Sequence, residues 1–294
     1  MRGNNTNSKW IYLLILSLIW GSSFILIKKS LLGLSPFQLG ALRTIITGIF
    51  LFTVGFRTLK SIESNQWKWL VLSGFIGSFF PAFLFAIAET EIDSSVASIL
   101  NSLTPLSTLL MGFAIFKITS THRQMVGVII GFVGTALLIF KGADLNPNQN
   151  YLFSGFVVLS TIMYAANVNI IKSRLHSVKP LAIATSNYVV IFIPAVIVLV
   201  FSGFFRDTTF DNPNFKMSMV YVTVLSFFGT ALAKVLFNNL IQISSPVFAS
   251  SVTYLMPIVA LIWGTLDGES FTWMQGLASL IILVGVYLSH RPKA

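Results

Sequence analysis

Apolar stretches of about twenty residues recur along the whole chain, and no other feature constrains its fold as strongly. An α-helix rises about 1.5 Å per residue, so about 20 apolar residues cross a hydrocarbon layer about 30 Å thick. Only 10% of the 294 residues are charged and 55% are hydrophobic, whereas a soluble domain carries roughly 25% charged residues. The sequence therefore predicts an all-α polytopic membrane protein.

Polar residues, prolines and glycines divide the apolar sequence into ten stretches. We expect transmembrane helices at residues 11–31, 36–56, 67–88, 94–116, 124–140, 152–172, 180–202, 217–241, 246–266 and 271–289. Ser35-Pro36 and Ser245-Pro246 mark two helix starts, because serine caps a helix and proline is tolerated in its first turn. If the N-terminus is cytoplasmic, most basic residues fall on the cytoplasmic side, with Lys28 and Lys29 as the main exceptions. Both termini are therefore predicted to be cytoplasmic.

The two halves of the sequence match each other at nearly constant offsets. One offset places Gly77 on Gly229 and also aligns Pro105 with Pro257. Five helices per half would make the second half enter the membrane from the opposite side. The sequence therefore predicts two inverted five-helix repeats, residues 1–141 and 152–294, joined by a linker at residues 142–151. Inverted repeats are typical of secondary transporters, which bind substrate between the repeats and expose it to each side in turn.

A lysine interrupts the apolar stretch at residues 217–241. Lys234 and Asn238 lie one helical turn apart in "ALAKVLFNNL". A cation buried without a carboxylate partner costs at least about 2.5 kcal/mol, and less if it lines a wet cavity. This favours Lys234 as a substrate-binding residue. Arg43 also lies within a predicted span, and either a cavity position or a side chain reaching the head groups fits it.

Each half carries a proline in its fourth predicted helix, Pro105 and Pro257. Proline frees the carbonyl four residues earlier and kinks the helix. Polar residues precede the two prolines by one and two turns, at Ser98, Asn101, Ser250 and Thr253. Either these helices are kinked and their carbonyls are satisfied by a neighbour, or their polar faces line a cavity.

The first predicted helix of each half contains one further candidate for lining a cavity. Trp20 lies about ten residues into its span, too deep for the interfacial aromatic belt. Asn167 lies in the corresponding helix of the second half and can hydrogen-bond between helices. Gly127 and Gly131 form a GxxxG pattern that we interpret as helix packing.

Several kinds of chemistry have no support in the sequence. No Asp or Glu lies clearly within a span and the three histidines lie in loops or tails, which disfavours a carboxylate proton relay. There is no phosphate-binding loop, paired-carboxylate site or histidine cluster with metal spacing. We therefore predict no enzyme activity, cofactor or metal. The net charge of +10 is interpreted as a membrane-orientation signal and not as nucleic-acid binding.

The chain resembles the EamA-type members of the drug/metabolite transporter superfamily. The resemblance rests on Trp20-Gly21-Ser22-Ser23-Phe24, Arg43, Asn101-Ser102-Leu103-Thr104-Pro105, Pro257, Gly268-Glu269 and Gly276. It implies a bacterial inner-membrane carrier, often an exporter of amino acids or other small metabolites, with a central cavity lined by both repeats. Two features depart from the family. Phe116-Lys117-Ile118-Thr119 lacks the acidic residue that Glu269 supplies in the second half, and Lys234 stands where family members more often have a neutral residue.

The leading hypothesis is a secondary carrier, most simply an exporter, for a small and possibly anionic or amino-acid-like metabolite. Lys234 would pair with its anionic group, while Asn101 and Asn238 would supply hydrogen bonds. The alternatives are a passive channel, a carrier for larger anions such as phosphorylated or nucleotide-linked compounds, and a membrane-embedded structural or sensor protein. The substrate, the direction of transport, any coupling ion and the oligomeric state stay open.

Overall fold

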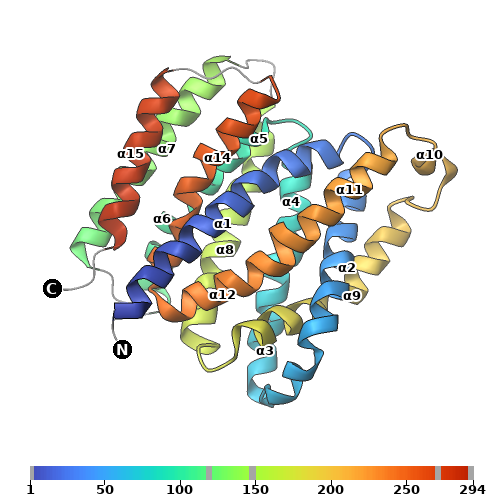
Figure 1. Cartoon of the computed structure of the whole chain (residues 1–294), viewed down its shortest axis with the longest axis horizontal. Helices are drawn as coiled ribbons and strands as arrows, with labels where there is room; N and C mark the ends of the chain where they lie inside the picture. The colour runs from blue at the N-terminus through green and yellow to red at the C-terminus, as the bar shows by residue number, and fades with distance from the viewer. Residues whose placement is uncertain (1–2, 117–120, 146–149, 269–272, 291–294) are drawn as a thin grey trace.

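The computed structural model describes residues 3–116, 121–145, 150–268 and 273–290, and every regular element within them is a helix (Figure 1). The longer helices are α1 Gly3–Ser30, α2 Pro36–Gly55, α3 Trp67–Gly74, α4 Phe80–Ala88, α5 Ser94–Asn101, α6 Thr104–Ala114, α7 His122–Leu145, α8 Ser154–Arg174, α9 Pro180–Phe201, α11 Phe215–Ser226, α12 Ala233–Ile243, α14 Val252–Leu266 and α15 Trp273–His290. Short elements are η1 Phe56–Ser61, η2 Ser64–Gln66, η3 Phe75–Phe79, η4 Tyr151–Phe153, α10 Asp207–Phe210, η5 Phe227–Leu232 and α13 Pro246–Ser250. Lys117, Glu269 and residues 146–149 of the expected linker lie outside the described residues.

Eight helical stretches among the described residues are long and apolar enough to cross a membrane. They are Ser8–Ser30, Pro36–Ser61, Ser64–Ala88, Ser94–Ala114, Ser154–Arg174, Pro180–Phe201, Phe215–Ile243 and Pro246–Leu266. This confirms a multi-pass helical protein. The fifth and tenth expected spans coincide with α7 and α15, which are not among these eight stretches. Ten membrane crossings therefore stay a prediction.

Both helix starts marked by a serine and a proline have the expected caps. Ser35 accepts a hydrogen bond from the backbone N–H of Gln38, whose side chain bonds back to the Ser35 N–H. Ser245 accepts a hydrogen bond from the Phe248 N–H in the same way. These bonds satisfy N–H groups that the first turn of a helix leaves without partners.

Two of the long helical stretches each contain one π-helical turn. The turn η3 joins α3 to α4 and contains Gly77, and η5 joins α11 to α12 and contains Gly229. A π turn bonds residue i to i+5 in place of i+4, and such turns occur mostly as single interruptions of α-helices, often at functional sites. The two turns therefore interrupt their helices at the two glycines that the sequence offset aligns.

The two prolines of the fourth helices act differently. Pro257 lies inside α14, as expected. Pro105 lies in the first turn of α6, after a break between α5 and α6, so it begins a helix and does not kink a continuous one. The carbonyl of Asn101 accepts a hydrogen bond from Thr104 Oγ1 at 2.7 Å, and that of Thr253 accepts one from Ser102 Oγ at 2.8 Å. Hydroxyl groups thus satisfy the carbonyls that the prolines leave free.

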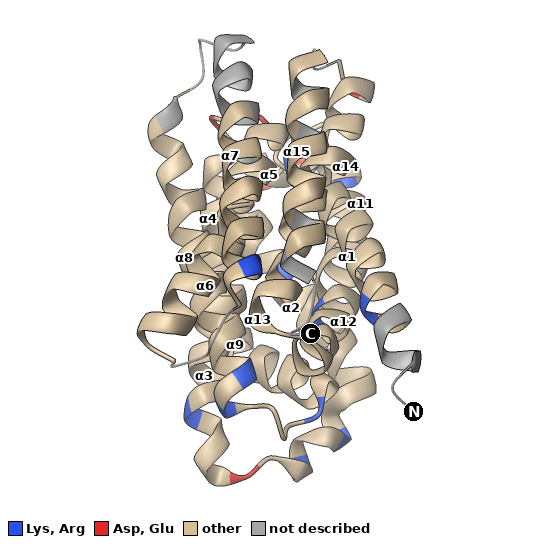
Figure 2. Cartoon of the chain, turned by 90° about the vertical axis from the view of Figure 1, so that its left-hand side faces the viewer, with Lys and Arg blue, Asp and Glu red and all other residues tan. Residues whose placement is uncertain are grey.

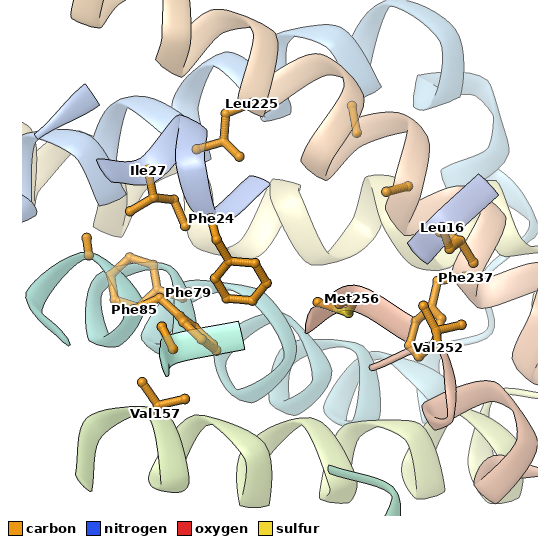
Figure 3. Close-up of a cluster of buried hydrophobic side chains, with 14 of the residues drawn as sticks. Leu16, Phe24, Ile27, Phe79, Phe85, Val157, Leu225, Phe237, Val252 and Met256 are labelled. Atoms are coloured by element: carbon orange, nitrogen blue, oxygen red, sulfur yellow. The ribbon is translucent and has the colours of Figure 1, made fainter. Parts of the chain in front are cut away.

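A continuous core of buried apolar side chains joins both halves of the chain. Figure 3 shows Phe24 and Phe85 beside each other, with Met256 and Phe237 further along the same core. The rings of Phe24 and Phe85 meet edge to face with centroids 5.9 Å apart. Helices α7 and α15 form a pair at one side of the bundle (Figure 1).

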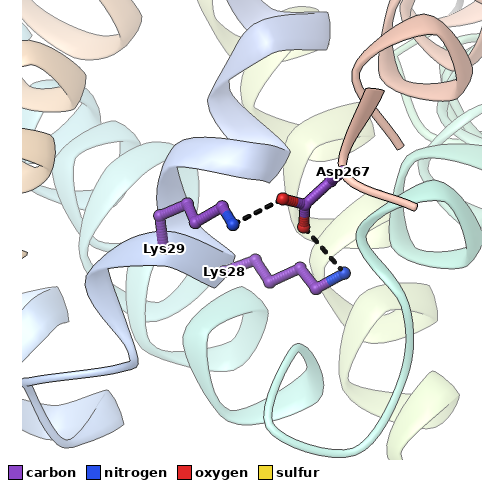
Figure 4. A network of polar contacts seen from close by, with 3 residues as sticks. All are labelled: Lys28, Lys29 and Asp267. Atoms are coloured by element: carbon purple, nitrogen blue, oxygen red, sulfur yellow. Dashed lines mark ion pairs between the residues drawn. The ribbon is translucent and has the colours of Figure 1, made fainter. Parts of the chain in front are cut away.

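Charged residues are sparse along the bundle, and the acidic ones lie toward its two ends (Figure 2). At one end Asp267, which follows α14, pairs with two lysines of α1 (Figure 4). Its oxygens lie 3.4 Å from Lys28 Nζ and 2.5 Å from Lys29 Nζ. At the opposite end of the long helices, Lys172 of α8 donates to the carbonyls of Ile241, Gln242 and Ser244 at 3.1, 3.1 and 2.7 Å.

Candidate functional site

A cavity of about 100 Å³ lies inside the bundle. Its lining comes from helices of both sequence halves, including α1, α2, η3, α8, η5 and α12. A single water needs roughly 10–15 Å³ of such volume, whereas pockets for drug-sized ligands measure roughly 300–1,000 Å³. In this conformation the cavity therefore has room for several waters or for part of a small metabolite.

Most of the candidate substrate-binding residues line this one cavity. They are Trp20, Arg43, Asn101, Asn167, Lys234, Ser250 and Thr253. Ser98 and Asn238 are buried but are not among the lining residues. Asn238 Nδ2 donates to the Pro180 carbonyl at 3.3 Å, so its side chain lies against the start of α9 and not beside Lys234.

Lys234 lies on the first turn of α12, and its side chain is directed into the bundle. The residue is only 8% exposed, and its ammonium group donates a hydrogen bond to the backbone carbonyl of Gly77 in η3. Among the lining residues that the structure describes, none is Asp or Glu. Lys234 therefore donates to a neutral acceptor, and a lysine ammonium can donate two hydrogen bonds more.

Arg43 is the second cation of the cavity. Its Nε donates to Thr230 Oγ1 at 2.9 Å, and Thr230 Oγ1 in turn donates to the Leu225 carbonyl at 3.1 Å. The π turn η5 thus presents a hydroxyl group to α2, and this group orients the guanidinium. The structure places Arg43 among the residues that line the cavity.

Trp20 of α1 contacts the same π turn. Its Nε1 donates to the Gly229 carbonyl at 2.9 Å, and its ring meets Phe237 edge to face with centroids 4.8 Å apart. A buried indole needs a partner for its N–H, and the carbonyl of Gly229 provides it. Gly77 and Gly229, which the sequence offset aligns, therefore accept the N–H groups of Lys234 and Trp20 respectively.

Asn167 links the cavity to a buried polar cluster. Its Oδ1 accepts a hydrogen bond from Ser73 Oγ at 2.6 Å, and Ser73 also contacts the Asn187 side chain at 3.1 Å. All three residues are buried. A Cβ added at Gly77 would collide with the Asn167 side chain, so a larger residue there would force Asn167 to move.

Sequence reasoning missed several lining residues. They are chiefly Thr230, Ser78, Tyr164 and Tyr188. Thr230 and Ser78 directly follow Gly229 and Gly77, so the aligned glycines could have indicated them. Nothing in the local pattern around Tyr188 distinguishes it from a tyrosine that packs between helices.

No group of three or more His, Asp or Glu side chains that could hold a metal ion occurs within the part of the chain that the structure describes. The donors of the cavity are instead ammonium, guanidinium, amide and hydroxyl groups. Such a set can bind an anionic or polar group by hydrogen bonds and charge.

Comparison with known proteins agrees with this architecture. The model of the EamA-like transporter family matches residues 8–140 and again residues 154–291. An "Uncharacterized transporter" of Archaeoglobus fulgidus is 28% identical over 288 residues, covering 97% of this chain and 99% of its own. The "Uncharacterized inner membrane transporter YedA" of Escherichia coli strain K12 is 25% identical, covering 94% and 88%.

Two further similarities bear on the fold and on the kind of protein. The "Probable amino-acid metabolite efflux pump" of Salmonella typhimurium is 24% identical over 94% of this chain and 92% of its own. A solved crystal structure has the same fold, with a TM-score of 0.71 at 16% identity over 99% of this chain and 98% of its own. Since the family model covers most of the sequence in two matches, the protein belongs to the EamA-like transporter family and is a multi-pass membrane transporter, not an enzyme.

Proposed function

We propose that this transporter is a secondary carrier that exports a small metabolite bearing a carboxylate group, such as an amino acid or a related organic acid. The observation that carries the proposal is the buried ammonium of Lys234, which faces a cavity without a carboxylate among its described lining residues. A substrate carboxylate would supply the missing counter-charge and so reduce the cost of burying the cation.

The remaining lining residues suit the same substrate. Arg43 adds a second positive charge, while Asn101, Asn167, Ser250 and Thr253 offer amide and hydroxyl groups for hydrogen bonds. Trp20 forms one aromatic wall for the apolar part of the substrate. Asn238 and Ser98 do not line the cavity, so we assign them to packing between helices and not to substrate binding.

We further propose ten transmembrane helices in two inverted repeats, residues 1–141 and 152–294, that move against each other by alternating access. The two matches of the family model and the matching π turns support this division. In Figure 1 the start of α1 lies near the end of α15, and the distribution of basic residues favours the cytoplasm for both termini. The inner-membrane name of the Escherichia coli relative supports the same membrane for this chain.

Three observations favour this proposal over its alternatives. The cavity volume suits a small metabolite better than a nucleotide-linked one. The efflux name of the Salmonella typhimurium relative supports export and an amino-acid-like substrate. A passive channel would need a continuous open path, whereas ion pairs join the last turn of α1 to Asp267, the residue after α14.

Three matched compounds test the charge preference of the purified protein. Hydrocinnamate is an anion, L-phenylalanine adds an ammonium group to it, and L-phenylalaninamide has only the positive charge. We expect the two carboxylates, and not the amide, to raise the Tm and to exchange in proteoliposomes faster than in protein-free liposomes. Lys234→Met should abolish the exchange, while Lys68→Met, an exposed lysine at the start of α3, should retain it.

Saturable exchange that is stimulated by compound on the opposite side identifies a carrier, whereas a large unitary conductance would establish a channel. Exchange by Lys234→Met at the wild-type rate would refute the assigned role of Lys234. A preference for L-phenylalaninamide would refute the carboxylate specificity.

A further inference from the structure

The segment from Gly229 to Lys234 makes polar contacts with three other helical stretches that line the cavity. Gly229 accepts the Trp20 N–H from α1, Thr230 accepts the Arg43 N–H from α2, and Lys234 donates to Gly77 in η3. The donor of the first contact is a neutral indole, whereas the donors of the other two belong to Arg43 and Lys234. All three partners lie in the other half of the sequence, and the Lys234 contact joins this segment to the stretch Trp67–Ala88.

The Lys234 contact is one that an anion can replace. A hydrogen bond between an ammonium group and a carboxylate is shorter and roughly twice as strong as one between neutral groups. A backbone carbonyl is a weaker partner for a cation than a carboxylate is. Because Lys234 and Gly77 both line the cavity, an anionic group that enters it reaches the ammonium beside the carbonyl already bound there.

We propose that the Lys234–Gly77 hydrogen bond holds η3 against α12 while the cavity is empty, and that a substrate anion breaks this bond by taking over the ammonium. The inference rests on the proposed function, since it requires an anionic group in the cavity. No bond other than hydrogen bonds changes, and the lysine keeps its charge. Substrate binding thereby weakens the polar connection between the two halves of the chain.

This exchange gives the substrate a differential effect on two conformations. A ligand shifts a conformational equilibrium only if it binds one state more tightly than the other. When η3 and α12 are together, the anion shares the ammonium of Lys234 with the Gly77 carbonyl oxygen, whose partial negative charge repels it, and when they are apart it does not. A hydrogen bond to a charged group corresponds to roughly tenfold to a hundredfold in an equilibrium constant, so we expect a shift of that size.

The absence of cysteine from the sequence allows a direct test by site-specific labelling. Thr90 follows α4 and Met217 lies on the first turn of α11, and both are exposed. Spin labels on Thr90→Cys and Met217→Cys report the separation of the two interrupted helical stretches in nanodiscs. We expect one dominant distance without ligand and a second population, at least tenfold enriched, with saturating hydrocinnamate.

Lys234→Met should populate the second distance without ligand and should not respond to hydrocinnamate, because it lacks the contact that the anion replaces. Lys68→Met is the matched control and should behave as the wild type. A Lys234→Met protein with the wild-type distance distribution would overturn the inference. So would hydrocinnamate that raises the Tm of the wild type without changing its distances.

The two proposals can fail separately. If hydrocinnamate does not raise the Tm, the proposal that the cavity binds a carboxylate is refuted. The spin-label distances of Lys234→Met without ligand then still show whether the Lys234–Gly77 contact holds the helices together. If Lys234→Met does not fold, the response of the wild type to hydrocinnamate decides the exchange, since that measurement needs no substitution at Lys234.

Discussion

Arg43 Nε lies 2.9 Å from Thr230 Oγ1, so a guanidinium of α2 is held by a hydroxyl group of the π turn η5. Thr230→Val removes this acceptor, together with the hydrogen bond to the Leu225 carbonyl, but leaves the charge of Arg43 in place. We expect Thr230→Val to raise the KM for hydrocinnamate about twofold to tenfold, the effect of one ordinary hydrogen bond. Arg43→Met also removes the charge and should raise the KM more, by tenfold or above.

Exchange kinetics in proteoliposomes measure both substitutions. Equal effects of the two variants would mean that the charge of Arg43 contributes nothing to binding. A normal KM for Arg43→Met would remove this residue from the site altogether.

Trp20→Phe should lower stability by about 1 kcal/mol, since it keeps an aromatic ring but loses the hydrogen bond to the Gly229 carbonyl. Trp263→Phe is the matched control. Trp263 Nε1 donates to Ser22 Oγ at 2.8 Å, but this tryptophan is 42% exposed. Thermal unfolding in detergent should show a clearly larger decrease in Tm for Trp20→Phe, and equal decreases would argue against a special role of the π-turn carbonyl.

Gly285→Ala should destabilise the pairing of α7 with α15. A Cβ on Gly285 would lie 2.6 Å from the Gly131 nitrogen and 2.7 Å from the Gly127 carbonyl oxygen. Because backbone atoms cannot rotate away, we expect a loss of about 1–3 kcal/mol or more. Gly155→Ala in α8 is the control, since its added Cβ meets no atom within 4 Å apart from its chain neighbours and the backbone of its own helix. Alanine is the better helix former, so this variant should unfold at the wild-type Tm or slightly above it.

The pairing of Asp267 with two lysines predicts an acid dependence. The hydrogen bond from Lys29, together with the charges of Lys29 and Lys28, holds the pKa of Asp267 below its ordinary value of 3.8. A lowered pKa in the folded state stabilises the protein above the unfolded-state pKa, and this contribution is lost as the pH falls through the folded-state pKa. The connection between α1 and α14 should therefore weaken only below about pH 4.

The Tm measured between pH 3 and pH 7 tests this dependence against Asp267→Asn. Exposed ion pairs contribute about 1 kcal/mol or less, so we expect a small decrease on acidification that the variant lacks. An equal acid response of both proteins would assign the effect to other carboxylates.

Hydrophobic run length was sufficient to predict the helical membrane fold, because a bilayer admits few other spanning structures. Residues at helix caps were equally predictable, as Ser35 and Ser245 illustrate. The π turns could not be predicted from the sequence, since no residue type requires one. The turn η5 stands directly before Lys234, and its bonding pattern differs from the α-helical one on which the sequence reasoning relied.

The candidate site was predicted best where a polar side chain had no explanation within its own helix. Lys234, Arg43 and Trp20 all proved to line the cavity. Asn238 did not, because one helical turn further along α12 the neighbour is the start of α9 and not the cavity. Helical periodicity predicts which face a residue lies on, but only tertiary packing decides what that face meets.

The ammonium of Lys172 donates to three backbone carbonyls at the end of α12, at 2.7–3.1 Å, much as a bound metal ion is coordinated by several carbonyl oxygens. Here the cation is covalently attached to α8, so it cannot be lost to solvent or replaced by another ion. The negative end of the α12 dipole is neutralised from within the chain. The adjoining ends of α8 and α12 should consequently move as one body, and any hinge between moving parts of the transporter has to lie elsewhere.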